Sequence, residues 1–204
     1  MFRSSVFIIF LFISPSIAAA KSPAGSILVI GDSISAAYGI KPEAGWVSLL
    51  ANKVTQQKKP YQVINASISG DTTINGVNRI EALLTKYQPA IVIIELGGND
   101  GLRGLPLKVM KKNLKKMIVL CQQYKAEVLL AGMKIPPNYG KRYSEGFYDI
   151  YQSLAREYTI RLVPFLLDGI GDKRALMQAD GIHPSEAAQP AIMQTVWKQL
   201  ETML

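Results

Sequence analysis

The sequence is poor in the residues that build metal and redox centres. Its 204 residues include one histidine, His183, and one cysteine, Cys121. A zinc site of Cys and His ligands, a Cys-X-X-Cys redox pair and a disulfide framework all need more such residues than this. A phosphate loop ending in Gly-Lys-Ser/Thr and a complete Gly-x-Gly-x-x-Gly fingerprint are also missing. These absences argue against nucleotide-driven and redox functions, and we expect no cofactor and no metal.

The remaining composition is that of one globular domain. Hydrophobic residues make up 49% of the chain and charged residues 19%, which is ordinary for a soluble fold. A chain of this length buries roughly 70% of the surface that its unfolded form exposes, so it needs no disulfide or metal to fold. The formal net charge is +8. Because no nucleic-acid recognition motif accompanies this charge, we expect no nucleic-acid partner.

The first 20 residues have the pattern of a secretory signal peptide. Arg3 supplies a positive start, residues 6–13 are apolar, and three alanines end the segment at Ala20. The alternative is an uncleaved membrane anchor, but eight apolar residues fall short of the ~20 that span a bilayer. We therefore expect cleavage near Ala20, a hydrolase domain over residues 21–204, and a periplasmic or secreted location.

The rest of the chain alternates short apolar runs with amphipathic stretches. The runs predict strands over residues 26–30, 61–64, 90–94, 127–131 and, more weakly, 161–163. The amphipathic stretches predict helices over about 44–57, 73–87, 106–124, 145–158 and 187–202. Strands separated by helices imply parallel pairing with right-handed crossovers, hence a three-layer α/β/α sandwich with about five central strands. Ligands bind outside the carboxyl ends of such strands, so functional residues are expected there.

Three residues have the chemistry of acyl transfer. Ser33 follows the first expected strand at a glycine turn, and a serine hydroxyl attacks well only when a base removes its proton. His183 is the one imidazole that can act as this base. Asp180, three residues earlier, can reach Nδ1 of His183, fix its tautomer and stabilise the imidazolium. Asp168 and Asp172 remain alternative acids, although no spacing argument favours them.

Four segments resemble the signature blocks of the SGNH (GDSL-type) hydrolases. They are residues 31–35 (Gly-Asp-Ser-Ile-Ser), 65–71, 95–100 and 180–184. Residues 99–104, 137–140 and 180–184 further resemble the periplasmic lipase, arylesterase, thioesterase and lysophospholipase branch of that family. The similarity extends over about residues 26–200. It implies an SGNH-type fold and a serine hydrolase that works through an acyl-serine intermediate.

The resemblance also assigns an oxyanion hole. Its donors are the backbone N–H groups of Ser33 and Gly70 and the side-chain amide of Asn99. The simpler interpretation is that Gly70 and the Asn99 segment are ordinary turns. Asp32, directly before the serine, is interpreted as a structural hydrogen-bonding residue and not as the triad acid. The Gly-x-Ser-x-Gly elbow of α/β-hydrolases is absent.

Residues 134–142 follow the fourth expected strand and contain two prolines. The resemblance implies a mobile loop in which Ile135 and Pro136 contact the acyl chain of the substrate. The alternative is a connector that is stiffened by its prolines.

Five lysines recur at helical spacing opposite an apolar stripe in the third expected helix. They are Lys108, Lys111, Lys112, Lys115 and Lys116. This lysine face is mainly a solvated helix surface. A sharper hypothesis is peripheral contact with an anionic membrane surface.

The sequence is therefore interpreted as an exported, monomeric serine hydrolase of carboxylic esters. The resemblance extends the expected substrates to acyl thioesters and lysophospholipids. One alternative is an arylesterase or carbohydrate deacetylase for small acyl groups. Another is a non-catalytic lipid-binding protein on the same fold, against which the intact set of candidate residues argues.

Overall fold

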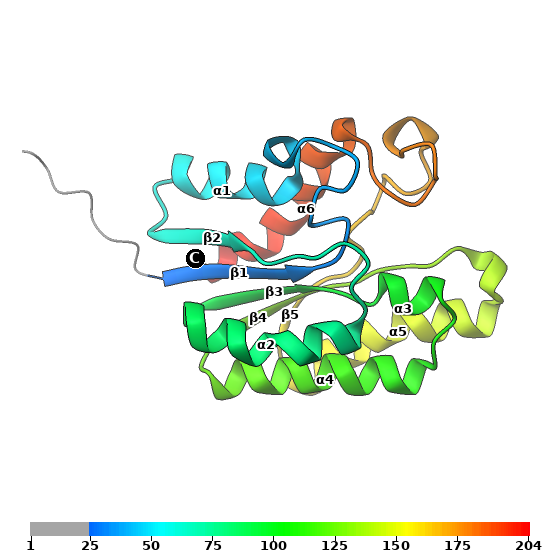
Figure 1. The fold of residues 1–204 in the computed structure, drawn as a ribbon, viewed down its shortest axis with the longest axis horizontal. Coiled ribbons are helices and arrows are strands. Elements are labelled where there is room, and N and C mark those ends of the chain that lie inside the picture. Colours follow the sequence, from blue (N-terminus) through cyan, green and yellow to red (C-terminus); the bar gives the residue numbers. More distant parts are fainter. Residues whose placement is uncertain (1–24) are drawn as a thin grey trace, which may run out of the picture.

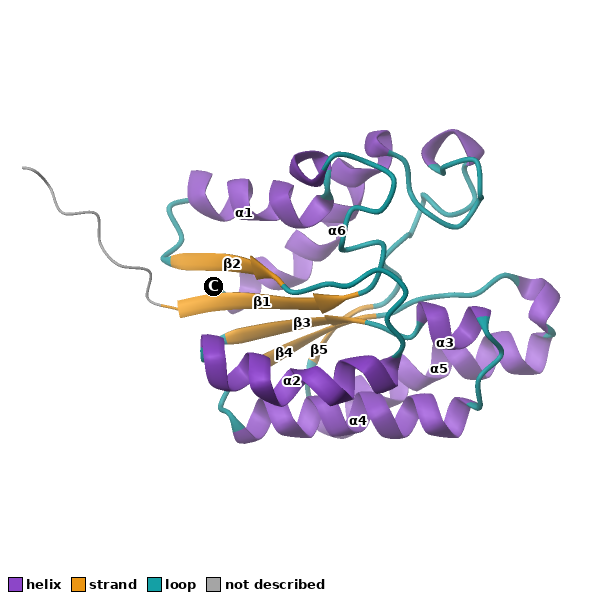
Figure 2. Ribbon diagram, in the orientation of Figure 1, coloured by secondary structure: helices purple, strands orange, loops and turns teal. Residues whose placement is uncertain are grey.

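Five parallel strands form the centre of the fold, in the order β2-β1-β3-β4-β5 (Figures 1 and 2). The computed structural model describes residues 25–204, so the expected signal peptide lies outside the described residues. The strands are β1 (Gly25–Gly31), β2 (Tyr61–Asn65), β3 (Ile91–Glu95), β4 (Glu127–Ala131) and β5 (Arg161–Val163). Each predicted strand is present, and the predicted three-layer sandwich is confirmed.

Helices cover both faces of this sheet (Figure 1). One face carries α1 (Trp46–Gln56) and α6 (Gln189–Leu200). The other carries α2 (Thr73–Tyr87), α4 (Leu107–Gln123) and α5 (Lys141–Tyr158). All five predicted helices are present, but α5 begins four residues earlier than expected. A short helix, α3 (Gly98–Leu102), replaces the turn that was the simpler interpretation of the Asn99 segment.

The core follows from coverage on both faces. The apolar residues of β1 and β3 are fully buried, as expected for central strands of a parallel sheet. The apolar stripe of α4 packs against β4, and its Cys121 is buried. Burial raises the pKa of the Cys121 thiol to about 12, so this cysteine is chemically inert at neutral pH. No helix in residues 25–204 combines the length and apolar character that crossing a bilayer requires.

The two edges of the sheet are built differently. Each of the four turns that lead from a helix into a strand contains a non-glycine residue in the left-handed conformation, with φ between 42° and 62°: Lys58, Gln88, Lys125 and Thr159. Such residues end a helix sharply, which keeps these turns short. Longer loops lie at the carboxyl edge, where Figure 1 shows the chain leaving β1, β2 and β3 side by side. The candidate residues come together at this carboxyl edge.

A buried polar cluster joins three helices there. Asp100 in α3 accepts hydrogen bonds from the backbone N–H of Thr73 at 2.8 Å and from its hydroxyl at 2.5 Å. Asn113 in α4 donates to the same hydroxyl at 3.0 Å. Thr72 is the N-cap of α2, and its backbone N–H donates to Oδ1 of Asn75 at 3.0 Å. The cluster fixes the start of α2 against α3 and α4.

Gly97, which precedes α3, provides a stability test. Its φ is +116°, and an added Cβ would lie 2.3 Å from the hydroxyl of the buried Tyr151. Gly104 has a φ of +63° with no atom within 4 Å of such a Cβ. Gly104→Ala should therefore lower the free energy of unfolding by only about 1–2 kcal/mol, the cost of a left-handed backbone for a residue with a Cβ. Gly97→Ala should cost a further ~1–3 kcal/mol through steric overlap.

Urea denaturation of both variants measures this difference. Equal losses in the free energy of unfolding would show that Tyr151 moves away at no cost.

Candidate active site

His183 lies between a serine and an aspartate within hydrogen-bond distance of both. Its Nε2 is 2.8 Å from Oγ of Ser33, in the turn after β1. Its Nδ1 is 2.6 Å from Oδ2 of Asp180, in the loop between β5 and α6. The structure thus brings together the three residues that sequence reasoning selected. The alternative acids Asp168 and Asp172 do not occupy the Nδ1 position.

The loop that carries Asp180 is held by its own hydrogen bonds. Oδ1 of Asp180 accepts the backbone N–H groups of Ile182 at 2.9 Å and His183 at 3.0 Å. The N–H of Gln178 donates to the carbonyl of His183 at 2.7 Å. The His183 backbone donor lowers the pKa of Asp180 to about 2, helped by the His183 side chain and the Ile182 N–H. Asp180 is therefore anionic at every pH at which it would stabilise a protonated His183.

Tyr38 contacts the other side of the imidazole. The centroids of the Tyr38 and His183 rings are 4.6 Å apart, at an interplanar angle of 40°. Gln178 donates to the Tyr38 carbonyl at 2.7 Å, which joins the two loops. Tyr38 and His183 also line a narrow hollow beside Ser33, whose free volume is about 0 Å³. Sequence reasoning missed Tyr38, because a lone tyrosine in a turn gives no signal.

Two backbone N–H groups point to no protein acceptor beside Ser33. Among the hydrogen bonds of residues 25–204, none is donated by the N–H of Ser33 or of Gly70. Gly70 has a φ of +84°, and a Cβ added there would meet nothing within 4 Å. Glycine is thus favoured at position 70 by its left-handed backbone, whereas steric room for a side chain is available.

Asn99 is fully engaged in the ligand-free site. Its Nδ2 donates to Oδ2 of Asp32 at 3.1 Å and to the carbonyl of Asp71 at 3.0 Å. An amide nitrogen has two hydrogens, so both of them already have acceptors. Donation to a substrate oxygen therefore requires Asn99 to share or release one of these contacts.

Two buried carboxyl groups lie beneath the Ser33 turn. Oδ1 of Asp32 accepts the N–H of Ile34 at 3.1 Å, which agrees with its interpretation as a structural residue. Oε2 of Glu95 accepts the N–H of Asp32 at 3.2 Å and the hydroxyl of Ser35 at 2.6 Å. Burial raises the pKa of Asp32 to about 6. It raises the pKa of the fully buried Glu95 well above its ordinary value, and the nearby Asp32 adds to this shift.

Arg79 in α2 ties three segments of the site together. Its Nε donates to Oδ2 of Asp71 at 2.8 Å. Its Nη1 and Nη2 donate to the carbonyls of Ala66 and Gly31, the latter at 3.3 Å. From the outer side, Arg103 donates to the Gly70 carbonyl at 3.2 Å. The sequence analysis missed both Arg79 and Glu95. For Glu95, the one available signal was a charged residue at the end of the apolar run of β3.

The two residues expected to contact the acyl chain are placed differently from each other. Ile135 is buried, and its Cγ2 packs so closely against α3 that a Cβ on Gly101 would lie 2.6 Å away. Pro136 is exposed in the loop before the short 3-10 helix Pro137–Tyr139. The Ile135 side chain therefore packs against α3.

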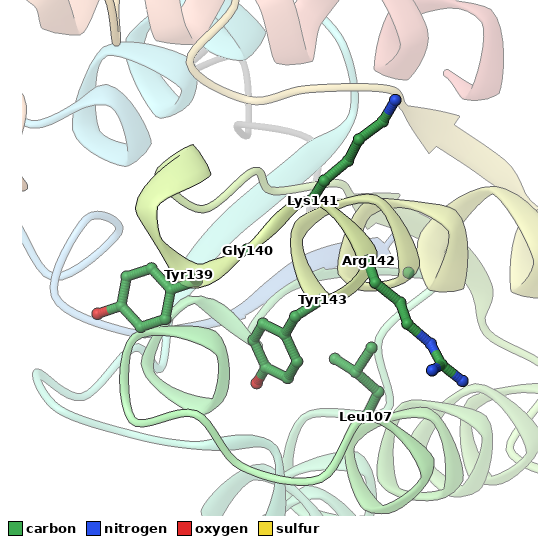
Figure 3. Close-up of a pocket in the computed structure, with 7 residues that line it drawn as sticks. Leu107, Tyr139, Gly140, Lys141, Arg142 and Tyr143 are labelled. Atoms are coloured by element: carbon green, nitrogen blue, oxygen red, sulfur yellow. The ribbon is translucent and has the colours of Figure 1, made fainter.

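A broad depression lies beyond this loop (Figure 3). It is lined by Leu107, Tyr139, Gly140, Lys141, Arg142, Tyr143 and Gly146. Tyr139 donates to the carbonyl of Leu102 at 2.9 Å, and Tyr143 donates to that of Leu105 at 2.7 Å. Figure 3 shows Lys141 pointing away from the two tyrosine rings. These bonds fasten the start of α5 to the loop after α3.

Comparison with known proteins identifies the family. The profile of the GDSL-like lipase/acylhydrolase family matches residues 29–190. The chain belongs to this family. It is 47% identical to esterase TesA of Pseudomonas aeruginosa over 184 residues, which cover 90% of this chain and 92% of the relative. It is 42% identical to thioesterase 1/protease 1/lysophospholipase L1 of Escherichia coli K12 over 181 residues, 89% and 86% of the two chains.

Solved structures of the family agree with this assignment. A crystal structure of TesA matches with a TM-score of 0.86 at 48% identity, covering 88% of this chain and 99% of that one. The psychrotrophic esterase EstA of Pseudoalteromonas sp. matches with a TM-score of 0.84 at 41% identity, with 88% and 98% covered. This GDSL-family chain is an ester hydrolase of the esterase and thioesterase type. The predicted family and enzyme class are confirmed, which leaves the non-catalytic alternative without support.

The first prediction concerns Arg79. Arg79→Met should lower kcat by roughly 10²-fold with a smaller effect on KM, because the ends of β1 and β2 lose their common donor and the site loosens. The matched control is Arg156→Met, since Arg156 is exposed on α5. Steady-state kinetics on a soluble ester, with circular dichroism to establish folding, measures the effect. An unchanged kcat in the folded variant would contradict it.

The second prediction concerns Asp32. The folded protein keeps the Asp32 proton up to about pH 6, whereas the unfolded carboxyl loses it near 3.8. In that window the folded state binds more protons, so the free energy of unfolding should fall as pH rises through about 6. Urea denaturation at successive pH values measures this slope. Asp32→Asn should flatten the slope, and an equally steep slope in that variant would assign the titration to another group.

Proposed function

We propose that Ser33 is the nucleophile, His183 the general base and Asp180 the acid that orients it. The observation that carries this proposal is the continuous hydrogen-bonded chain Asp180–His183–Ser33 beside two N–H groups that have no acceptor in residues 25–204. A base within reach of a serine, itself oriented by a carboxylate, is the arrangement that activates a hydroxyl for attack on an ester.

The reaction then runs in two acyl-transfer steps. Oγ of Ser33 attacks the ester carbonyl carbon while Nε2 of His183 takes the hydroxyl proton. The negative charge that develops on the carbonyl oxygen is stabilised by the N–H groups of Ser33 and Gly70. The tetrahedral intermediate collapses, and His183 returns the proton to the departing alcohol. Water, deprotonated by the same imidazole, releases the acid from Ser33.

Asn99 joins the oxyanion hole by exchanging an acceptor. Its amide donates to the neutral carbonyl of Asp71 in the ligand-free site. A hydrogen bond to a charged oxygen is about twice as strong as one to a neutral carbonyl, so the developing oxyanion competes well for this donor. The bond to Asp32 is retained and keeps the amide in place. Asn99 therefore acts mainly in the transition state.

Carboxylic esters are the core substrates, and we extend them to acyl thioesters and lysophospholipids. The extension is supported by the names of relatives, among them the Escherichia coli thioesterase 1/protease 1/lysophospholipase L1. A second candidate is an arylesterase for small acyl groups. It is favoured by the 46% identical arylesterase of Vibrio mimicus, matched over 90% of this chain and 92% of that one.

We further propose a monomeric enzyme that is exported to the periplasm and contacts anionic lipid at its surface. The signal-like composition of residues 1–20 supports export, although that segment lies outside the described residues. On the lysine face, Lys115 pairs with Glu157 at 3.0 Å, while Lys108, Lys112 and Lys116 are exposed.

Ser33→Ala tests the nucleophile. The variant should lose ester turnover by ~10⁴ or more while the fold persists, because only the hydroxyl is removed. Ser69→Ala is the matched control, since Ser69 is an exposed serine in the loop after β2. Labelling with an active-site phosphonate, followed by peptide mapping, identifies the modified residue. Labelling of another residue, or activity retained by Ser33→Ala, would overturn the proposed mechanism.

A series of esters from acetyl to palmitoyl separates the two substrate classes. The highest kcat/KM on long chains supports the lysophospholipase assignment, whereas a maximum at acetyl supports the arylesterase.

A further inference from the structure

Most of the exposed apolar surface lies at one edge of the sheet. Seven large hydrophobic side chains are exposed in residues 25–204, and Tyr124 alone among them lies at the amino edge, before β4. The other six follow strand ends or occupy the loops and first helical turns at the carboxyl edge. We call them the apolar rim: Tyr38, Ile68, Ile74, Val109, Tyr139 and Ile182.

Three members of the apolar rim, Tyr38, Ile68 and Ile182, lie in loops close to Ser33 and His183. The Tyr38 ring contacts His183, and Ile182 is its neighbour in sequence. On the β2 side, the N–H of Ile68 donates to the Gly31 carbonyl at 3.0 Å. The remaining members lie on α2, α4 and the loop before α5. The hydrogen bond between Asn113 and Thr73 joins α4 to α2, and the hydrogen bond of Tyr139 joins the loop before α5 to the end of α3. Members far apart in sequence therefore share one edge of the molecule.

Cationic side chains flank the apolar rim on the α4 and α5 side. Arg103, Lys108, Lys141 and Arg142 are exposed at the same edge, and the Lys141 side chain is 86% exposed. Its nearest carboxylate, on Glu145, is 3.8 Å away. Nearer Ser33, the carboxylates of Asp71 and Asp180 are already paired with Arg79 and His183. Exposed apolar side chains bordered by cations are complementary to an anionic lipid surface.

The cavity beside Ser33 points to the same partner. Its free volume is about 0 Å³, whereas sites that enclose a small molecule hold ~300–1,000 Å³. A long acyl chain attached to a carbonyl at Ser33 therefore extends over the apolar rim. That chain is best accommodated where the rim meets a hydrocarbon phase.

We propose that the apolar rim is the docking surface of this enzyme for anionic lipid surfaces, with its aliphatic members entering the interface and the flanking cations contacting headgroups. This inference rests on the proposed function for its lipid substrates. It moves the membrane contact from the lysine face to the carboxyl edge, where a docked molecule presents Ser33 to the lipid.

The test uses Ile74 and Val109, which lie in the first turns of α2 and α4. Ile74→Ser/Val109→Ser should lower cosedimentation with vesicles of equal parts phosphatidylcholine and phosphatidylglycerol by about tenfold or more, because each aliphatic side chain no longer leaves water. Tyr124→Ser at the amino edge should bind as wild type does. Hydrolysis of a soluble acetate ester should be the same in all three proteins.

Charge is tested by a second matched pair. Lys141→Gln/Arg142→Gln should weaken binding to the same vesicles, and salt should reduce the difference between this variant and wild type. Lys58→Gln/Lys125→Gln removes the same charge at the amino edge and should leave binding unchanged. On vesicles of phosphatidylcholine alone, both pairs should bind as wild type does.

Several outcomes would overturn the docking proposal. They are absence of vesicle binding by wild type, equal binding by the Ile74/Val109 variant, and an equal loss in the Tyr124 control. Loss of self-association in the Ile74/Val109 variant, without loss of vesicle binding, would make a second copy of the chain the occupant. Vesicle binding is measured without turnover. If the protein binds vesicles but does not cleave lysophospholipid, the proposal that lysophospholipids are substrates is contradicted, whereas the docking proposal is supported.

Discussion

The guanidinium of Arg79 is the interaction on which the geometry of the site depends. Parallel strands end at the same edge, but nothing in the sheet fixes the loops beyond its last hydrogen bonds. Arg79 donates to the carbonyls of Gly31 and Ala66 and to the carboxylate of Asp71. Gly31 leads into the Ser33 turn, and Asp71 follows Gly70. A planar group with donors in a fixed fork thus sets the separation between the Ser33 turn and the Gly70 segment.

The carboxyl pair beneath Ser33 extends this constraint. Two adjacent buried carboxyls rarely ionise together, and the Asp32 charge adds to the upward pKa shift that burial causes at Glu95. At Asp32, hydrogen bonds from the Ile34 N–H and the Asn99 amide favour the charged form and counteract the effect of burial on its pKa. The negative charge therefore settles beside Asn99. Its burial is unfavourable to folding, and the apolar contacts of β1 and β3 offset that cost.

Local patterns predicted the strands, the helices and the contact of Asp180 with His183 because their information is local, whereas the family resemblance was needed to associate Ser33 with His183, 150 residues away. Apolar runs and amphipathic stretches define strands and helices, and the three-residue spacing of Asp180 and His183 places both in one loop. Glu95 was missed because its partners Asp32 and Ser35 lie 63 and 60 residues away along the chain. Arg79 was missed although Asp71 is only eight residues away. On an amphipathic helix an arginine is indistinguishable from a solvated one. Ile135 packs against Gly101, and no sequence pattern reports such packing; its contact with an acyl chain stays a prediction.

The contrast between the two edges explains why most of the exposed apolar side chains lie at the carboxyl edge. At the amino edge, four left-handed residues turn each helix directly into the next strand. These turns are short and polar, so they leave few side chains to cover. At the carboxyl edge, longer loops converge on Ser33, and a helix laid across them would close the approach of the substrate. Apolar residues in those loops therefore stay uncovered in the free protein. The feature that keeps the site open is thus the one that leaves apolar side chains exposed at this edge.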